Sequence, residues 1–89
     1  MPPVPVARYL AANIRARRIR LDLTQEQLAE CIGLGVKHMQ KIEAGKVDVT
    51  ISMVAKLASV LRTVPDQLLL PATLPPPRHG RPKKTKKSQ

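Results

Sequence analysis

The side chains best suited to chemistry in this chain are hydrogen-bond donors in one short segment, residues 36–44. Lys37 and Lys41 lie four residues apart, which is one turn of a helix, and Gln40 lies beside them. Lysine can donate to the O6 and N7 acceptors of guanine, whereas valine suits the methyl group of thymine. On a helix that lies in a DNA groove, the side chains that we expect to contact base edges are Val36, Lys37, Gln40 and Lys41. The alternative for either lysine is simple neutralisation of a phosphate.

Residues for catalysis or metal binding follow no recognised pattern. The chain has two histidines, His38 and His79, and one cysteine, Cys31. No Ser-His-Asp arrangement, glycine-rich phosphate loop or metal-ligand spacing accompanies them. We therefore expect no enzymatic activity, cofactor, metal or small-molecule ligand. A single cysteine also excludes an intramolecular disulfide, and Cys31 receives no redox role.

A short helix must precede the donor segment and position it. Thr24 and Gln27 have the spacing of a capping box, in which the threonine hydroxyl accepts from the third helical amide. The spacing predicts a helix over residues 25–32 that ends at Gly33. Its apolar face consists of Leu28, Ala29 and Ile32.

The donor segment itself has the apolar spacing of a second helix. Met39 and Ile42 predict a helix over residues 36–44, and Gly45 closes it. Gly35 permits the cap conformation at its start but supplies no side-chain acceptor. Two short helices joined by a tight glycine turn form the helix-turn-helix pattern, whose second helix lies in the DNA major groove.

The remaining elements complete a small helical core. A first helix is predicted over residues 6–21, with Val6, Leu10 and Ile14 facing inward, and Asp22 is expected to adopt the left-handed conformation at its end. Thr50 is the predicted N-cap of a fourth helix. Its buried face is predicted to contain Ile51, Val54, Leu57, Ala58 and Leu61.

A fifth short helix is predicted to begin at Pro65, whose missing amide is no loss at a first helical position. Asp66 there complements the helix dipole, and Leu68 and Leu69 are expected to complete the core. The predicted fold is all-α, a compact bundle of about five short helices containing the helix-turn-helix. A disordered, proline-rich and basic C-terminal tail follows it.

The charge is strongly positive and concentrated at the C-terminal end. The 89 residues carry a net charge of +10, and residues 78–89 hold six Lys/Arg and no acid. We divide the chain into a flexible leader (1–5), a helical domain (6–70) and a disordered tail (71–89). Such charge indicates a polyanionic partner. A membrane is disfavoured because the basic tail has no apolar residue to insert.

The tail is predicted to contact DNA through Arg78, Arg81, Lys83 and Lys84. The segment from His79 to Lys84 looks like the core of an AT-hook, in which Gly-Arg-Pro enters a narrow A·T minor groove. We favour general electrostatic binding by a low-complexity basic segment over a true minor-groove hook.

The motifs together resemble the lambda-repressor and Cro-like helix-turn-helix family, over about residues 14–69. The residues that carry the resemblance are Ile14, Arg15, Arg18, the run from Leu23 to Ala29, Gly33, Ile42, Glu43, Gly45, Leu57, Ala58, Leu61, Leu68 and Leu69. The resemblance implies that Gln25 contacts a phosphate and braces the recognition helix. It also implies a partly buried structural salt bridge between Arg18 and Glu43. The full set of predicted phosphate contacts is Gln25, Arg15, Arg17, His38 and Lys46.

The leading hypothesis is a sequence-specific regulator of transcription that binds double-stranded DNA. The resemblance implies a repressor that acts as a homodimer on inverted half-sites. Phage regulators, restriction-modification controllers and antitoxins all remain open. The alternatives are a weakly specific architectural nucleic-acid binder driven by the tail and a protein-binding adaptor. No apolar run could span a bilayer and no secretory signal is evident, so we expect a cytoplasmic, nucleoid-associated location.

Overall fold

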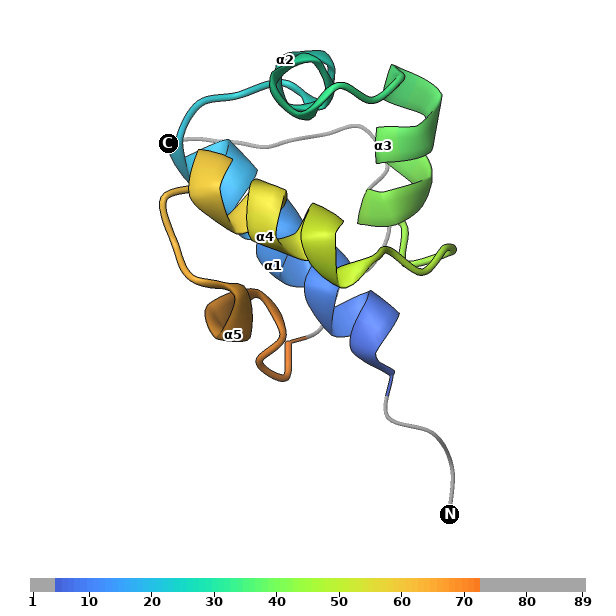
Figure 1. Ribbon diagram of the computed structural model, residues 1–89, viewed down its shortest axis with the longest axis vertical. Helices are drawn as coiled ribbons and strands as arrows, with labels where there is room; N and C mark the ends of the chain where they lie inside the picture. Colours follow the sequence, from blue (N-terminus) through green and yellow to red (C-terminus); the bar gives the residue numbers. More distant parts are fainter. Residues whose placement is uncertain (1–4, 73–89) are drawn as a thin grey trace, which may run out of the picture.

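The computed structural model describes residues 5–72, which form five α-helices and no strand within that range (Figure 1). The helices are α1 (Val6–Arg20), α2 (Gln25–Ile32), α3 (Val36–Glu43), α4 (Ile51–Val60) and α5 (Pro65–Leu68). The predicted all-α bundle is therefore confirmed, and the helix boundaries agree with the prediction to within a residue. The contacts predicted for the tail lie outside the described residues.

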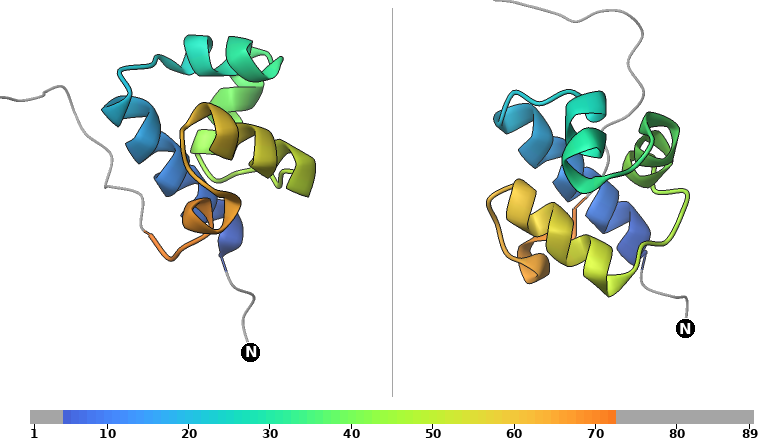
Figure 2. Two further views of the ribbon diagram at one scale, coloured as in Figure 1. Left: turned by 60° about the vertical axis from the view of Figure 1, so that its left-hand side comes forward. Right: turned by 45° about the horizontal axis from the view of Figure 1, so that its top comes forward.

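Helices α2 and α3 lie on one side of α1 and α4, and α5 lies on the other (Figures 1 and 2). Helix α1 packs against α3 and α5, while α2 packs against α3 and α4. The long α1 thus supports the end of the bundle that carries α3. None of these described helices has the length and apolar character needed to cross a membrane.

The local signals at the helix ends behave as the sequence predicts. Thr24 and Gln27 form the reciprocal capping box of α2, and Thr50 Oγ1 accepts from the amide of Met53 at the start of α4. Asp22 adopts the left-handed conformation with φ 61°, and Gly33 does so with φ 78°. These ends set the short connections on either side of α2, and hence the position of α3.

The core is aliphatic, and three residues predicted for it lie at the surface instead. Val6 is 43% exposed, Ile51 is 88% exposed and Leu69 is 39% exposed. Val6 and Ile51 begin their helices, where side chains tilt toward the N-terminus and so extend beyond the first turn. Leu69 lies one residue past the end of α5, and a rotation of about 100° from the buried Leu68 turns it toward solvent. The largest fully buried side chains are Ile14, Leu28, Met39, Ile42, Leu57, Leu61 and Leu68.

Candidate nucleic-acid interface

Helix α3 buries one face and presents lysines on the other. Met39 and Ile42 are 0% and 1% exposed and anchor the helix in the core. Lys37 and Lys41 are exposed, and their rotation around the helix places them opposite these two residues. The anchored face therefore leaves two ammonium groups, one turn apart, directed away from the protein.

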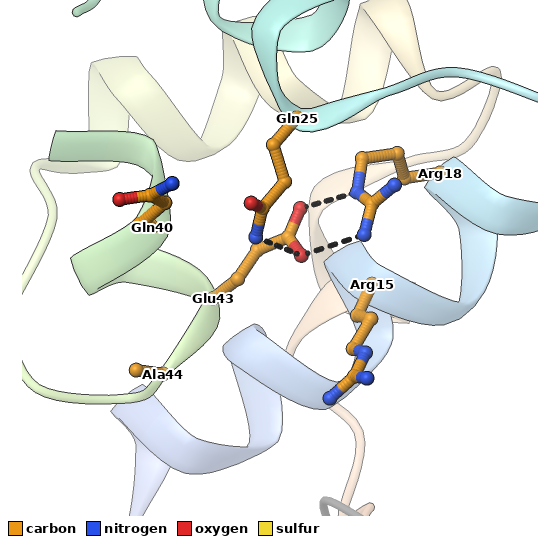
Figure 3. Close-up of a pocket in the computed structure, with 6 residues that line it drawn as sticks. All are labelled: Arg15, Arg18, Gln25, Gln40, Glu43 and Ala44. Atoms are coloured by element: carbon orange, nitrogen blue, oxygen red, sulfur yellow. Dashed lines mark hydrogen bonds and ion pairs between the residues drawn. The ribbon is translucent and has the colours of Figure 1, made fainter. Parts of the chain in front are cut away.

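The other two residues predicted to read bases lie one turn apart along one edge of this outward face. Val36 is only half-buried rather than fully exposed, because it lies at the edge between the buried and outward faces. Gln40 is exposed and lines a pocket that also includes Gln25, on the side of α3 that meets α1 and α2 (Figure 3). Lys37 and Lys41 are therefore the most outward-facing members of the predicted set.

A hydrogen-bonded ion pair joins α1 to the end of α3. Arg18 Nε donates to Glu43 Oε2 at 2.6 Å, and Arg18 Nη2 donates to Glu43 Oε1 at 3.1 Å. The two side chains are 13% and 3% exposed, so the predicted salt bridge is confirmed and partly buried. Arg18 Nη1 also donates to the Leu23 carbonyl at 2.8 Å, which fixes the connection before α2. The sequence offered no signal for this third bond.

Gln25 joins α2 to the same carboxylate. Its Nε2 donates to Glu43 Oε1 at 3.1 Å, so three helices meet at one acid (Figure 3). An amide NH₂ has a second hydrogen that it can donate to a phosphate. Gln25 is also the first residue of α2, where backbone amides favour an anion. The geometry thus agrees with a bracing role and leaves the phosphate contact as a prediction.

An open pocket of about 360 Å³ lies between α1, α2 and the end of α3. Arg15 and Gln40 line it together with the Arg18–Glu43 pair (Figure 3). Because the charges of that pair cancel, the exposed Arg15 leaves the pocket with a net positive charge. An open, positively charged pocket beside the exposed lysines of α3 suits a phosphate oxygen better than an apolar ligand.

The remaining predicted phosphate contacts are not all on one surface. Lys46 is exposed directly after α3, and His38 is exposed on the flank of α3 opposite Gln40. Arg17 is half-buried, and it lies about 200° around α1 from Arg15. The structure therefore brings Arg15 and Lys46 to the α3 side of the bundle and does not bring Arg17 there. Among residues 5–72, no group of three potential metal ligands occurs.

The fold and the site define a helix-turn-helix protein whose second helix is basic and solvent-facing. A family model described as helix-turn-helix matches residues 14–69, and the chain belongs to this lambda-repressor and Cro-like family. Members of the family are DNA-binding regulators of transcription. The matched range begins in α1 and ends just after α5, so it includes the whole described site.

Several regulatory proteins are similar to this chain. The control protein C.SmaI of Serratia marcescens is 38% identical over 64 residues, covering 72% of this chain and 76% of its own length. A hypothetical transcription factor of Neisseria meningitidis is 34% identical over 62 residues, covering 70% of this chain and 58% of its own. Two uncharacterised HTH-type regulators, of Sinorhizobium medicae and Rhizobium meliloti, are 32% identical, and this chain spans 42% of their length.

Solved structures show the same arrangement. The Neisseria transcription factor NHTF has a TM-score of 0.71 and 30% identity, with 80% of this chain and 84% of that chain covered. The restriction-modification controller C.AhdI of Aeromonas hydrophila has a TM-score of 0.65 and 29% identity, covering 70% of this chain and 94% of that chain.

Proposed function

We propose that this chain regulates transcription by binding double-stranded DNA and reading base edges with α3. The single observation that carries the proposal is that α3 has one buried apolar face and, opposite it, one exposed basic face. Met39 and Ile42 fix the helix in the core while Lys37 and Lys41 face solvent. Val36 and Gln40 would extend the contact along one edge of the helix. The proposed activity is binding alone, without catalysis, which agrees with the regulatory family to which the chain belongs.

Phosphate contacts would orient the reading helix. Gln25, Arg15 and Lys46 lie near α3 and would bind the DNA backbone beside it. His38 remains a candidate from its exposed flank. Arg17 is the weakest member of the set because it lies on the far side of α1 from Arg15.

The proposed assembly is a homodimer that represses transcription from an inverted repeat, with half-sites about one helical turn apart. Large aliphatic side chains exposed on and beside α4 and α5 would suit a dimer surface. They are Ile51, Val64, Leu69 and Leu70. Similarity to C.SmaI and to C.AhdI favours a restriction-modification controller among the three kinds of regulator left open by the sequence.

Binding-site selection from random duplex DNA tests this proposal. The full chain should enrich an inverted-repeat motif, and the Lys37→Ala/Lys41→Ala variant should lose it. A matched control, Lys56→Ala/Arg62→Ala, removes the same charge from exposed positions on and after α4 and should retain the motif. Enrichment of the same motif by the Lys37/Lys41 variant would contradict the proposal, and so would the absence of any motif with the full chain.

A protein-binding adaptor is the less favoured alternative. Acidic or apolar residues on the outward face of α3 would support it, and the exposed Lys37 and Lys41 argue against it. The architectural alternative depends on the tail, which lies outside the described residues. It predicts A·T-rich enrichment in the same selection without an inverted repeat.

A further inference from the structure

The first turn of α1 lies against the end of α3. Gly45 follows α3 with φ 71°, and a Cβ built on it would lie 3.3 Å from Arg8 Cγ and 3.4 Å from Arg8 Cα. A side chain at position 45 would therefore be strained and would also press on α1, so both the backbone angle and the close contact favour glycine. The aliphatic part of the Arg8 side chain therefore lies across Gly45. This places Arg8 near Lys46, the next residue in the chain.

Arg8 also lies in line with Arg15 along α1. The two residues are seven apart, which returns to the same face of a helix after about 10 Å. Arg15 lines the pocket beside α3, and Arg8 lies against Gly45, just after the end of α3. Both are exposed, so α1 presents two guanidinium groups along the C-terminal half of α3. We call Arg8 and Arg15 the α1 arginine edge.

The α1 arginine edge differs from Arg18 in its ion pairing. Within residues 5–72 the recorded salt bridge is Arg18–Glu43, and neither Arg8 nor Arg15 has an acidic partner there. Arg8 also lies in the first turn of α1, where a cation opposes the helix dipole and where this helix has no acid. Helix stability therefore gives no reason for an arginine at position 8, whereas an anionic partner would.

We propose that Arg8 is a DNA-phosphate contact. With Arg15 and Lys46, it holds the DNA strand that passes the C-terminal end of α3. The proposal rests on the proposed function and adds to its site a residue that the sequence patterns did not single out. A guanidinium can donate two parallel hydrogen bonds to one phosphate. Such a contact sets how α3 lies in the groove and carries no sequence information of its own.

The test uses two conservative variants of the full chain and one control. Arg8→Gln keeps the carbons that cross Gly45 and removes the charge, whereas Arg8→Lys keeps the charge. Lys56→Gln removes a charge from the groove between α2 and α4. Dissociation constants are measured against salt on two duplexes, one with the selected motif and one with its bases shuffled, and thermal unfolding is followed in parallel.

Arg8→Gln should weaken binding to both duplexes alike, by about 3- to 10-fold near 0.1 M salt. It should also reduce the magnitude of the log–log salt slope by about 0.9, the value for one lost phosphate contact. Arg8→Lys should retain the slope, and Lys56→Gln should change neither quantity. The unfolding midpoint of Arg8→Gln should not fall, because the removed cation opposes the dipole of α1.

Unchanged affinity and slope in Arg8→Gln would overturn the proposal, and so would a loss confined to the motif duplex, which indicates a base contact. A fallen unfolding midpoint would overturn it as well, since Arg8 would then be structural. Failure of the proposed function has a different signature. In that case the wild-type chain would bind both duplexes equally, and Lys37→Ala/Lys41→Ala would not change their relative affinities.

Discussion

Replacement of Arg18 by methionine is the sharpest test of how α3 is held. The variant keeps an unbranched side chain of similar length and removes the three hydrogen bonds that Arg18 donates to Glu43 and to the Leu23 carbonyl. Glu43 would keep the bond from Gln25 Nε2. Its carboxylate would then be a charge with 3% exposure and no cation beside it.

The expected cost follows from that burial. Removing one partner of a buried ion pair costs about 3–5 kcal/mol. A domain the size of residues 5–72 has a free energy of unfolding of about 3–10 kcal/mol at the usual value per residue. Arg18→Met should therefore remove between a third and all of the stability. Removing the charge of the other partner with Glu43→Gln leaves Arg18 at 13% exposure, where solvent can reach it. This change should therefore lower the free energy of unfolding by only about 1.5–3 kcal/mol.

Urea unfolding followed by far-ultraviolet circular dichroism provides the measurement. Arg15→Met is the matched control, because it makes the same change at an exposed position of the same helix and should stay within about 0.5 kcal/mol of wild type. The double variant Arg18→Met/Glu43→Leu should recover most of the loss, since apolar pairs often replace buried ion pairs without cost. If Arg18→Met costs no more than Arg15→Met, the pair behaves as a surface ion pair and the reasoning is refuted.

Two further predictions concern helix caps. Thr24→Ala removes the hydroxyl that accepts from the Gln27 amide and should lower the free energy of unfolding by about 1 kcal/mol. Gly35→Ser should raise it by a few tenths of a kcal/mol, because position 35 has the same extended N-cap backbone as Thr24 and a Cβ there would meet nothing within 4 Å. Urea titration of both variants measures these effects. If the free energy of unfolding of Thr24→Ala equals that of wild type, or if that of Gly35→Ser falls below it, the two N-caps are not formed as described.

Helix positions were predictable because their signals are local. A capping box such as Thr24 with Gln27 involves residues within one turn, and the left-handed end at Asp22 depends on its own backbone. Burial at helix ends was less predictable. The apolar spacing that places Ile51 on the buried face says nothing about where the neighbouring helices stop, and they leave it 88% exposed.

The site shows the same division between local and long-range information. Lys37 and Lys41 follow from the period of α3 alone. The bond from Arg18 to the Leu23 carbonyl and the approach of Arg8 to Gly45 depend on how α1 crosses the other helices. A spacing of seven between Arg8 and Arg15 was present in the sequence. It becomes informative only once the face of α1 that meets α3 is known.

The position of each arginine around α1 decides what its charge can do. Arg18 meets Glu43 and contributes no net charge to the surface, whereas Arg17 lies away from α3. Only Arg8 and Arg15 combine exposure with the α3 side of the bundle. The strength of phosphate binding should therefore follow the number of cations on this face and not the net charge of the chain. On this argument, equal reductions in net charge at Arg8 and at Lys56 have unequal effects on the salt dependence of DNA binding.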